Sequence, residues 1–473
     1  MRACLIIVLI SAICAPADTI YLKNGRRILA DRVRQGSTHV EYDIGDNSYA
    51  IPKSLVDHVD ATGMPPSETA QAALDSQKPA SEMPEFTPSV TLDGSQVVVS
   101  VIKNGQVDTS VLDSLDRSGN AQMAAAGYFL AGQHEEQAGH RQRAQSYFEH
   151  ALGLTPQNPA ILTHYAAVLL RGGNYRQAMD QAGQAARLAP DSADAYTVLG
   201  FAQFMSDRSQ DAVRSWKHSL QLRPDPTVQQ FLAKAQREVA TEANFSERET
   251  GHFTLRYEGR QTSDEFRRQL LQALDADYND LSTQLDGQPR YSIPVVLYTE
   301  QEFFDVTQAP GWTNAINDGK LRIPVSGLTE MTPELAHVLK HELAHSFINQ
   351  LSAGRCPQWL HEGIAQLLEP RTAAPFGPRL GQLMSQHQAL PFNMLEGSFI
   401  RFSTPEARLA YDESLSAVEY IRDTYGMDDL VRILRRIAEG SSTEAALRAT
   451  IHTDYAGLEN EVGAFLQEKH GRP

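Results

Sequence analysis

The segment His341-Glu342-Leu343-Ala344-His345 is followed, seventeen positions after its second histidine, by Glu362 in Trp359-Leu360-His361-Glu362-Gly363. Two histidines four positions apart project from one face of a helix, close enough to hold a single zinc ion. Glu342, between them, would lie beside the ion and suits a general base that acts on metal-activated water. Glu362, from the next helix, would complete three protein ligands and leave a fourth position open. The pattern predicts a zinc-dependent hydrolase site.

The flanking residues predict that both histidines lie well inside a helix. Thr332-Pro333-Glu334 has the pattern of a helix start, with an N-cap, a proline at the first position and an early acidic residue. Gly354 and Pro357 close the segment. Apolar residues recur between them at helical spacing: Leu335, Val338, Leu339 and Leu343.

A second helix, from Pro357 to Glu369, is predicted to carry Glu362. Gly363 costs a helix interior about 1 kcal/mol relative to alanine and indicates close approach by another backbone. His361 precedes Glu362 directly and should point roughly 100° away from it. His337 lies one turn before His341, but no glutamate follows it, which favours a solvated or supporting histidine. The alternative is that Glu362 is a solvated surface acid and the histidine spacing a coincidence.

These two motifs resemble the gluzincin metallopeptidases, the thermolysin-like peptidase MA clan, over roughly residues 250–470. The resemblance implies that His341, His345 and Glu362 bind Zn²⁺ and that Glu342 activates water. It also implies a small sheet before the metal helix, whose edge strand receives the backbone of a peptide or protein substrate. It does not distinguish endopeptidase from exopeptidase action.

Three segments are predicted strands of that sheet: 253–257, 293–298 and 320–325. The last of them precedes the metal helix and is the candidate edge strand, with an ordinary interior strand as the alternative.

Peptide hydrolysis also needs a hydrogen-bond donor for the developing oxyanion. In the aminopeptidase branch of the clan a tyrosine downstream of the third ligand has this role, and Tyr411-Asp412-Glu413-Ser414 resembles it in placement. Serine stands where glycine is usual, so a packing or surface role for Tyr411 stays open. Tyr420 and Tyr425 are weaker alternatives.

An internal repeat occupies the middle of the chain. Leu154-Thr155-Pro156, Leu188-Ala189-Pro190 and Leu222-Arg223-Pro224 recur at a period of 34, as do Ala144, Ala178 and Ala212. A 34-residue period with small residues at helix crossings resembles the tetratricopeptide repeat. Three two-helix units over residues 121–225 and a capping helix over 226–240 are expected. Such a solenoid has a groove for a peptide or partner protein, or it is a rigid spacer that presents the catalytic domain.

The first residues predict export. Met1-Arg2, an apolar run from Leu5 to Ile13 and Ala15-Pro16-Ala17 form the three parts of a signal peptide over residues 1–17. Cys14 raises the alternative of a lipoprotein, but Ile13 stands where a small residue is expected. We therefore expect an extracytoplasmic protein, periplasmic or secreted, with no transmembrane segment. Only Cys356 would remain after cleavage, which excludes an intramolecular disulfide.

The fold class is multidomain: a small N-terminal β domain, an all-α solenoid and an α+β zincin-like peptidase domain. The predicted boundaries are 1–17 for the signal peptide, 18–60 for an antiparallel β domain and 61–90 for a flexible linker. The β domain is expected to have turns at residues 24–25 and 45–47. Residues 91–120 are unassigned apart from a strand at 97–101, residues 121–243 are the solenoid, and residues 244–473 are the peptidase domain. A net charge of −16, from 58 acidic and 42 basic residues, argues against a nucleic-acid partner.

The leading hypothesis is an exported zinc peptidase with a repeat module for partner or substrate docking. One rival keeps the peptidase class but takes Glu419 as third ligand, because Glu419-Tyr420-Ile421-Arg422-Asp423 has the E-x-x-x-D spacing of membrane-associated metallopeptidases with the same repeats. A second rival is a non-catalytic or regulatory scaffold that retains the zinc fold.

Overall fold

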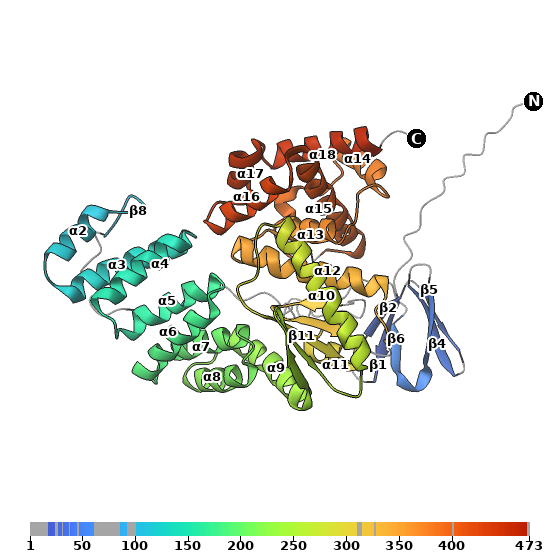
Figure 1. Cartoon of the computed structure of the whole chain (residues 1–473), viewed down its shortest axis with the longest axis horizontal. Coiled ribbons are helices and arrows are strands. Elements are labelled where there is room, and N and C mark those ends of the chain that lie inside the picture. The colour runs from blue at the N-terminus through green and yellow to red at the C-terminus, as the bar shows by residue number, and fades with distance from the viewer. Residues whose placement is uncertain are drawn as a thin grey trace, which may run out of the picture. The chain divides into compact units, whose positions relative to one another are not determined.

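The computed structural model describes residues 18–23, 27–30, 32–36, 38–44, 47–60, 86–91, 101–309, 315–325, 328–399 and 402–470. The predicted signal peptide and the predicted turn at 24–25 lie outside these residues. So do two of the three residues of the predicted turn at 45–47, most of the predicted linker and most of the predicted strand at 97–101. The chain divides into two compact units, residues 1–79 with 309–313, and residues 80–308 with 314–473 (Figure 1).

The first unit contains two three-stranded antiparallel sheets, with strand orders β2-β1-β6 and β3-β4-β5. Their strands are β1 (Asp18–Leu22), β2 (Arg27–Ala30), β3 (Arg32–Gln35), β4 (His39–Ile44), β5 (Asn47–Pro52) and β6 (Val56–Asp60), with a short 3-10 turn, η1 (Lys53–Leu55), before β6. Ile20, Val40, Tyr42 and Val56 are buried in their core. A small N-terminal β unit is therefore present, as the fold class predicted.

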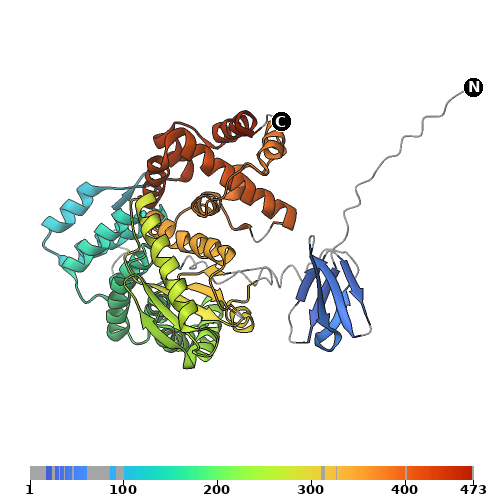
Figure 2. The same cartoon turned by 45° about the vertical axis from the view of Figure 1, so that its right-hand side comes forward.

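The second unit begins, within the described residues, with a segment at 86–91, a hairpin and a solenoid of helix pairs that stack side by side in both views (Figure 1, Figure 2). The hairpin is β7 (Ile102–Lys103) and β8 (Gln106–Val107), followed by α2 (Thr109–Arg117). The pairs are α3 (Ala121–Gln137) with α4 (Arg141–Leu154), α5 (Pro159–Arg171) with α6 (Tyr175–Leu188), and α7 (Ala193–Met205) with α8 (Ser209–Leu222). Helix α9 (Pro226–Thr241) and a 3-10 turn, η3 (Glu242–Asn244), follow.

The 34-residue period has a steric cause. Ala144, Ala178 and Ala212 are each 0% exposed, at equivalent positions in the second helix of each pair, where close packing favours a small side chain. Gly200 in α7 is a second example, since a Cβ atom there would lie 2.4 Å from the Trp216 ring nitrogen. Repeat-type helices are thus present where the sequence predicts them.

A five-stranded sheet with the order β12-β13-β11-β10-β9 follows the solenoid. Its strands are β9 (Ser246–Glu249), β10 (Phe253–Tyr257), β11 (Ile293–Tyr298), β12 (Ile316–Asn317) and β13 (Leu321–Pro324). The central pairs β10/β11 and β11/β13 are parallel, while both outer strands are antiparallel to their neighbours. Helices α10 (Asp264–Gln284) and α11 (Glu300–Thr307) make the two parallel connections.

The three predicted strands are present, but the predicted edge is wrong. Strand β13 pairs with β11 on one side and with β12 on the other, so β12 is the edge strand on this side of the sheet. Sequence patterns missed β12 because two residues are too few to show alternation.

Helices make up the rest of the described chain and share one apolar core with the sheet. They are α12 (Pro333–Ser352), α13 (Gln358–Leu368), α14 (Gly377–Ser385), η4 (Phe392–Leu395), α15 (Thr404–Tyr425), α16 (Met427–Ala438), α17 (Thr443–Ile451) and α18 (Tyr455–His470). Helix α13 packs between α12 and α15. Among the described residues, none of the helices has the length and apolar character needed to cross a membrane.

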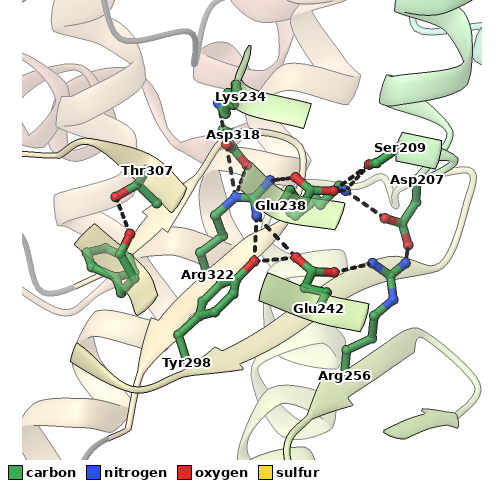
Figure 3. Close-up of polar contacts among 12 residues, drawn as sticks. Asp207, Ser209, Lys234, Glu238, Glu242, Arg256, Tyr298, Thr307, Asp318 and Arg322 are labelled. Carbon is green, nitrogen blue, oxygen red and sulfur yellow. Dashed lines mark hydrogen bonds and ion pairs between the residues drawn. The ribbon is translucent and has the colours of Figure 1, made fainter. Parts of the chain in front are cut away.

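A cluster of buried and half-buried charges joins the end of the solenoid to the sheet (Figure 3). Its carboxylates are Asp207, Glu238, Glu242 and Asp318, and its cations are Lys234, Arg256, Lys320 and Arg322. Arg322 of β13 donates to Glu238 of α9 at 2.6 Å and to Asp318 at 3.0 Å, and Lys234 contacts Asp318 at 2.7 Å. Burial alone would raise the pKa of Glu238, but Lys320 and Arg322 outweigh it and lower that pKa.

We predict that Glu238→Gln lowers the free energy of unfolding by about 3–5 kcal/mol, because it leaves buried cations without their counter-charge. Glu247→Gln is the matched control. Its side chain also contacts a cluster cation, Arg256, but is 51% exposed, so its loss should cost at most about 1 kcal/mol. Chemical unfolding followed by helical circular dichroism measures both. An equally small change in the two variants would mean that the cluster adds no net stability.

Candidate metal centre

The candidate centre lies where α12 crosses α13, and local sequence fixes both helices. The Thr332 side chain accepts a hydrogen bond from the Leu335 backbone, and Pro333 occupies the first helical turn, as predicted. Helix α12 ends at Ser352 and is followed by Ala353, which has a left-handed conformation (φ 50°), and by Gly354 (φ 69°). Both motif histidines therefore lie in the middle of a regular helix.

The structure places the Glu362 carboxylate near both motif histidines, while each of the two metal-capable groups of the described residues contains only part of this predicted set. The Glu362 carboxylate lies 3.5 Å from His341 Nε2 and 4.0 Å from His345 Nε2. Glu362 and His345 are buried, at 7% and 8% exposure. Glu342 belongs with His341 and His345 to a group of side chains whose donor atoms lie within 4.8 Å of one another. The alternative hypothesis that Glu362 is a solvated surface acid is thus wrong.

His361 also lies in this cluster, contrary to the expectation that it points away. It forms a second group with His345 and Glu362 within the same 4.8 Å limit. A metal ion lies in the plane of each imidazole that binds it, so parallel stacked rings disfavour a shared ion. The rings of His341 and His345 are perpendicular (89°), and their planes can meet at one ion. The rings of His345 and His361 are stacked (11°, 4.5 Å), so their planes cannot meet at a common ion.

Supporting residues hold the donor atoms in place. Glu369 accepts a hydrogen bond from His341 Nδ1 at 3.0 Å, which leaves Nε2 aimed at Glu362. Gln358 donates to Glu362 Oε1 at 2.9 Å. Asn317 of the edge strand β12 donates to the Glu342 backbone carbonyl at 2.6 Å. The edge strand is therefore tied directly to the helix that carries the histidines.

Gly363 explains how α13 reaches this position. A Cβ atom at Gly363 would lie 2.3 Å from the Ser414 carbonyl oxygen and 2.6 Å from Val418 Cγ2. The absence of a side chain lets the backbone of α13 contact that of α15, as the sequence predicted. Tyr411, also on α15, accepts a hydrogen bond from Gln366 of α13 through its backbone carbonyl at 3.1 Å.

The electrostatics of the cluster favour a cation. Burial would lower the pKa of His341, but hydrogen bonds to Glu362 and Glu369 outweigh it and raise the pKa to about 10. Burial likewise opposes ionisation of Glu362, yet the neighbouring histidines lower its pKa to about 2. Burial raises the pKa of Glu342 to about 7 and lowers that of His345 well below its usual value. Buried carboxylates that converge on two imidazoles demand positive charge, and this donor set fits a divalent metal.

The candidate oxyanion donor, Tyr411, is half-buried, and its ring packs edge-on against Phe399 with centroids 5.3 Å apart. Burial raises the pKa of its hydroxyl, and the charges of Glu362 and Glu342 add to the shift. The hydroxyl is therefore protonated at neutral pH and lies within electrostatic reach of both glutamates.

The other predicted candidates lie elsewhere. Glu419 accepts hydrogen bonds from the Ala373 backbone and from Lys469, both at 2.7 Å, and is in neither metal-capable group of the described residues. His337 is exposed. Tyr420 donates to Glu461 at 3.0 Å.

Sequence reasoning missed Glu369 and Asn317. Glu369 follows Glu362 by seven positions, two helical turns, so its placement on the same face was available as a signal. For Asn317 the sequence holds no such signal, because its hydrogen bond to Glu342 depends on how β12 packs against α12.

Comparison with known proteins assigns two regions. Residues 291–468 match the Peptidase MA superfamily, and residues 136–200 match the tetratricopeptide repeat. The first range contains α12, α13 and α15, and the second lies within the helix pairs.

Individual relatives are similar over shorter stretches. The small glutamine-rich tetratricopeptide repeat-containing protein 2 of Mycosarcoma maydis is 29% identical over 121 residues, 26% of this chain and 31% of that protein. The chain thus spans about a third of that relative's length. MamA from Desulfovibrio magneticus RS-1 is 19% identical with a TM-score of 0.24, covering 32% of this chain and 88% of that one. The MamA structure designated MSR-1 is 18% identical with a TM-score of 0.24, covering 28% and 84%. The chain carries a Peptidase MA superfamily domain together with tetratricopeptide repeats.

Proposed function

We propose that this protein is an exported zinc-dependent peptidase. One observation carries the proposal: the buried Glu362 carboxylate lies 3.5 Å from His341 Nε2 and 4.0 Å from His345 Nε2, and the two imidazoles are perpendicular, an arrangement that suits a single zinc ion with an open position. Zinc bound there would supply Lewis acidity to the attacking water and to the scissile carbonyl. Export is proposed from the sequence of residues 1–17 alone.

The side chains have distinct proposed roles. Glu342 takes the proton of the attacking water and passes it to the leaving amine. Glu369 fixes the orientation of His341 through Nδ1. The Tyr411 hydroxyl donates to the oxyanion of the substrate. The backbone of β12, at the sheet edge and tied to α12 by Asn317, pairs with the backbone of an extended peptide or protein substrate.

Metal analysis of the purified protein, paired with a peptide-library cleavage screen, tests this function. We expect about one zinc ion per chain, cleavage of some library members, loss of cleavage with a chelator, and recovery when zinc is returned. Cleavage that persists at full rate after complete zinc removal would contradict the proposal. Stoichiometric zinc without any cleavage would favour a non-catalytic scaffold.

A further inference from the structure

Residues 86–91 (Phe-Thr-Pro-Ser-Val-Thr) lie on the solenoid as a segment without regular secondary structure, although the sequence up to residue 90 was predicted to be a flexible linker. One carboxylate oxygen of Asp194 on α7 accepts three hydrogen bonds of 2.8 Å, from the Ser89 and Val90 backbone N–H groups and from the Ser89 hydroxyl. His164 of α5 lies 3.0 Å from the Val90 carbonyl through Nε2.

The side chains of residues 86–91 make further contacts with the solenoid. Arg223, directly after α8, donates to the Ser89 hydroxyl at 2.8 Å and also forms an ion pair with Asp194. Pro88 is buried, and Phe86 packs against the solenoid core with its ring 6.4 Å from that of Phe201. The groups involved come from two successive repeats, because α5 and α7 are the first helices of neighbouring pairs.

The mode of attachment is that of a bound peptide. Among the described residues, no hydrogen bond between two backbones joins 86–91 to the solenoid, and the polar contacts come from solenoid side chains. Asp194 and His164 are 3% and 0% exposed. Burial lowers the pKa of His164 to about 4, so its neutral ring donates from Nε2 to the Val90 carbonyl. If the segment leaves, the Asp194 carboxylate needs replacement hydrogen-bond donors and the His164 ring needs a replacement acceptor.

We propose that this face of the solenoid is a binding site for an extended segment of a partner protein with an aromatic residue two positions before Pro-Ser. Residues 86–91 are its resident occupant and compete in cis with that partner. The inference goes beyond the proposed peptidase function and deepens the docking role that the sequence predicts for the repeats. A tethered segment is present at high effective concentration, so a partner peptide binds only to the fraction of chains in which the segment has left.

The probe is a fluorescent peptide with the sequence of residues 84–92, and binding is followed by anisotropy in a Glu342→Gln background, so that cleavage does not enter. We expect weak binding to the chain with its own segment intact. Combining Phe86→Ala with Ser89→Ala in the chain should tighten binding about tenfold or more, because the competitor is weakened while the site is intact. A peptide carrying the same two changes should not bind.

Adding Asp194→Asn to the weakened chain should abolish binding, whereas Asp191→Asn, an exposed acid three residues earlier, should not. Ser89→Pro in the chain is an independent variant, since it removes an N–H donor and the hydroxyl without altering the solenoid. Circular dichroism checks that each variant keeps its helices. If neither weakened chain binds the peptide more tightly than the intact chain, the segment is a structural part of the solenoid and the inference is wrong. That result would leave zinc content and library cleavage, and hence the proposed peptidase, unaffected.

Discussion

Glu342→Gln should keep zinc and lose hydrolysis, with kcat/KM for a cleaved library peptide falling by about 10²–10⁴-fold. Glutamine has nearly the same shape but cannot accept the proton of the attacking water. His341, His345 and Glu362, which we propose as the ligands, are unchanged in this variant. Metal analysis and steady-state kinetics on the same preparation separate binding from chemistry.

Glu334→Gln is the matched control, because Glu334 lies on the same helix, is exposed and is remote from the candidate ligands. It should cost little activity or zinc. Normal turnover by Glu342→Gln would remove Glu342 from the mechanism. Loss of zinc together with activity would instead make Glu342 a ligand, as its proximity to both histidines allows.

Those features of the candidate centre that depend on neighbouring residues in the sequence could be predicted. A capped helix with a proline at its first position orients His341 and His345, and both features are written in consecutive residues. Glu362 was predicted from its position seventeen residues after His345, and its carboxylate lies 3.5 Å from His341 Nε2 and 4.0 Å from His345 Nε2. His361 was misjudged, because a 100° step along α13 says nothing about where α12 crosses it. The ring of His361 reaches His345 from the neighbouring face and stacks on it.

The sheet and the solenoid show the same limit. Alternation identified the strand at 320–325, but Lys320 and Arg322 on its polar side are buried, because Glu238 of α9 and the nearby acids cover them. A period of two gives the side on which a residue lies and not what packs there. Likewise, a stretch rich in proline and serine has the composition of a linker, yet Asp194, more than a hundred residues later, holds Ser89 and Val90.

The choice of third ligand gives the other large expected effect. Glu362→Ala should weaken zinc binding by more than about 100-fold and abolish cleavage, because removing a ligand exceeds the 10–100-fold cost typical of a supporting residue. His361→Ala should retain zinc, since its ring is parallel to that of His345. Competition with a metal indicator measures the affinity of each variant.

Glu419→Ala is the decisive comparison, because Glu419 is equally buried and also an acid. It should retain zinc but lose about 1–3 kcal/mol of stability, since the Ala373 N–H and the Lys469 ammonium would lose their acceptor. If Glu362 is the third ligand, Glu362→Ala therefore loses zinc and largely keeps its stability, whereas Glu419→Ala keeps zinc and loses stability. If Glu419→Ala releases the metal and Glu362→Ala does not, the E-x-x-x-D ligand set is correct, and the convergence of α12 and α13 has only a structural role.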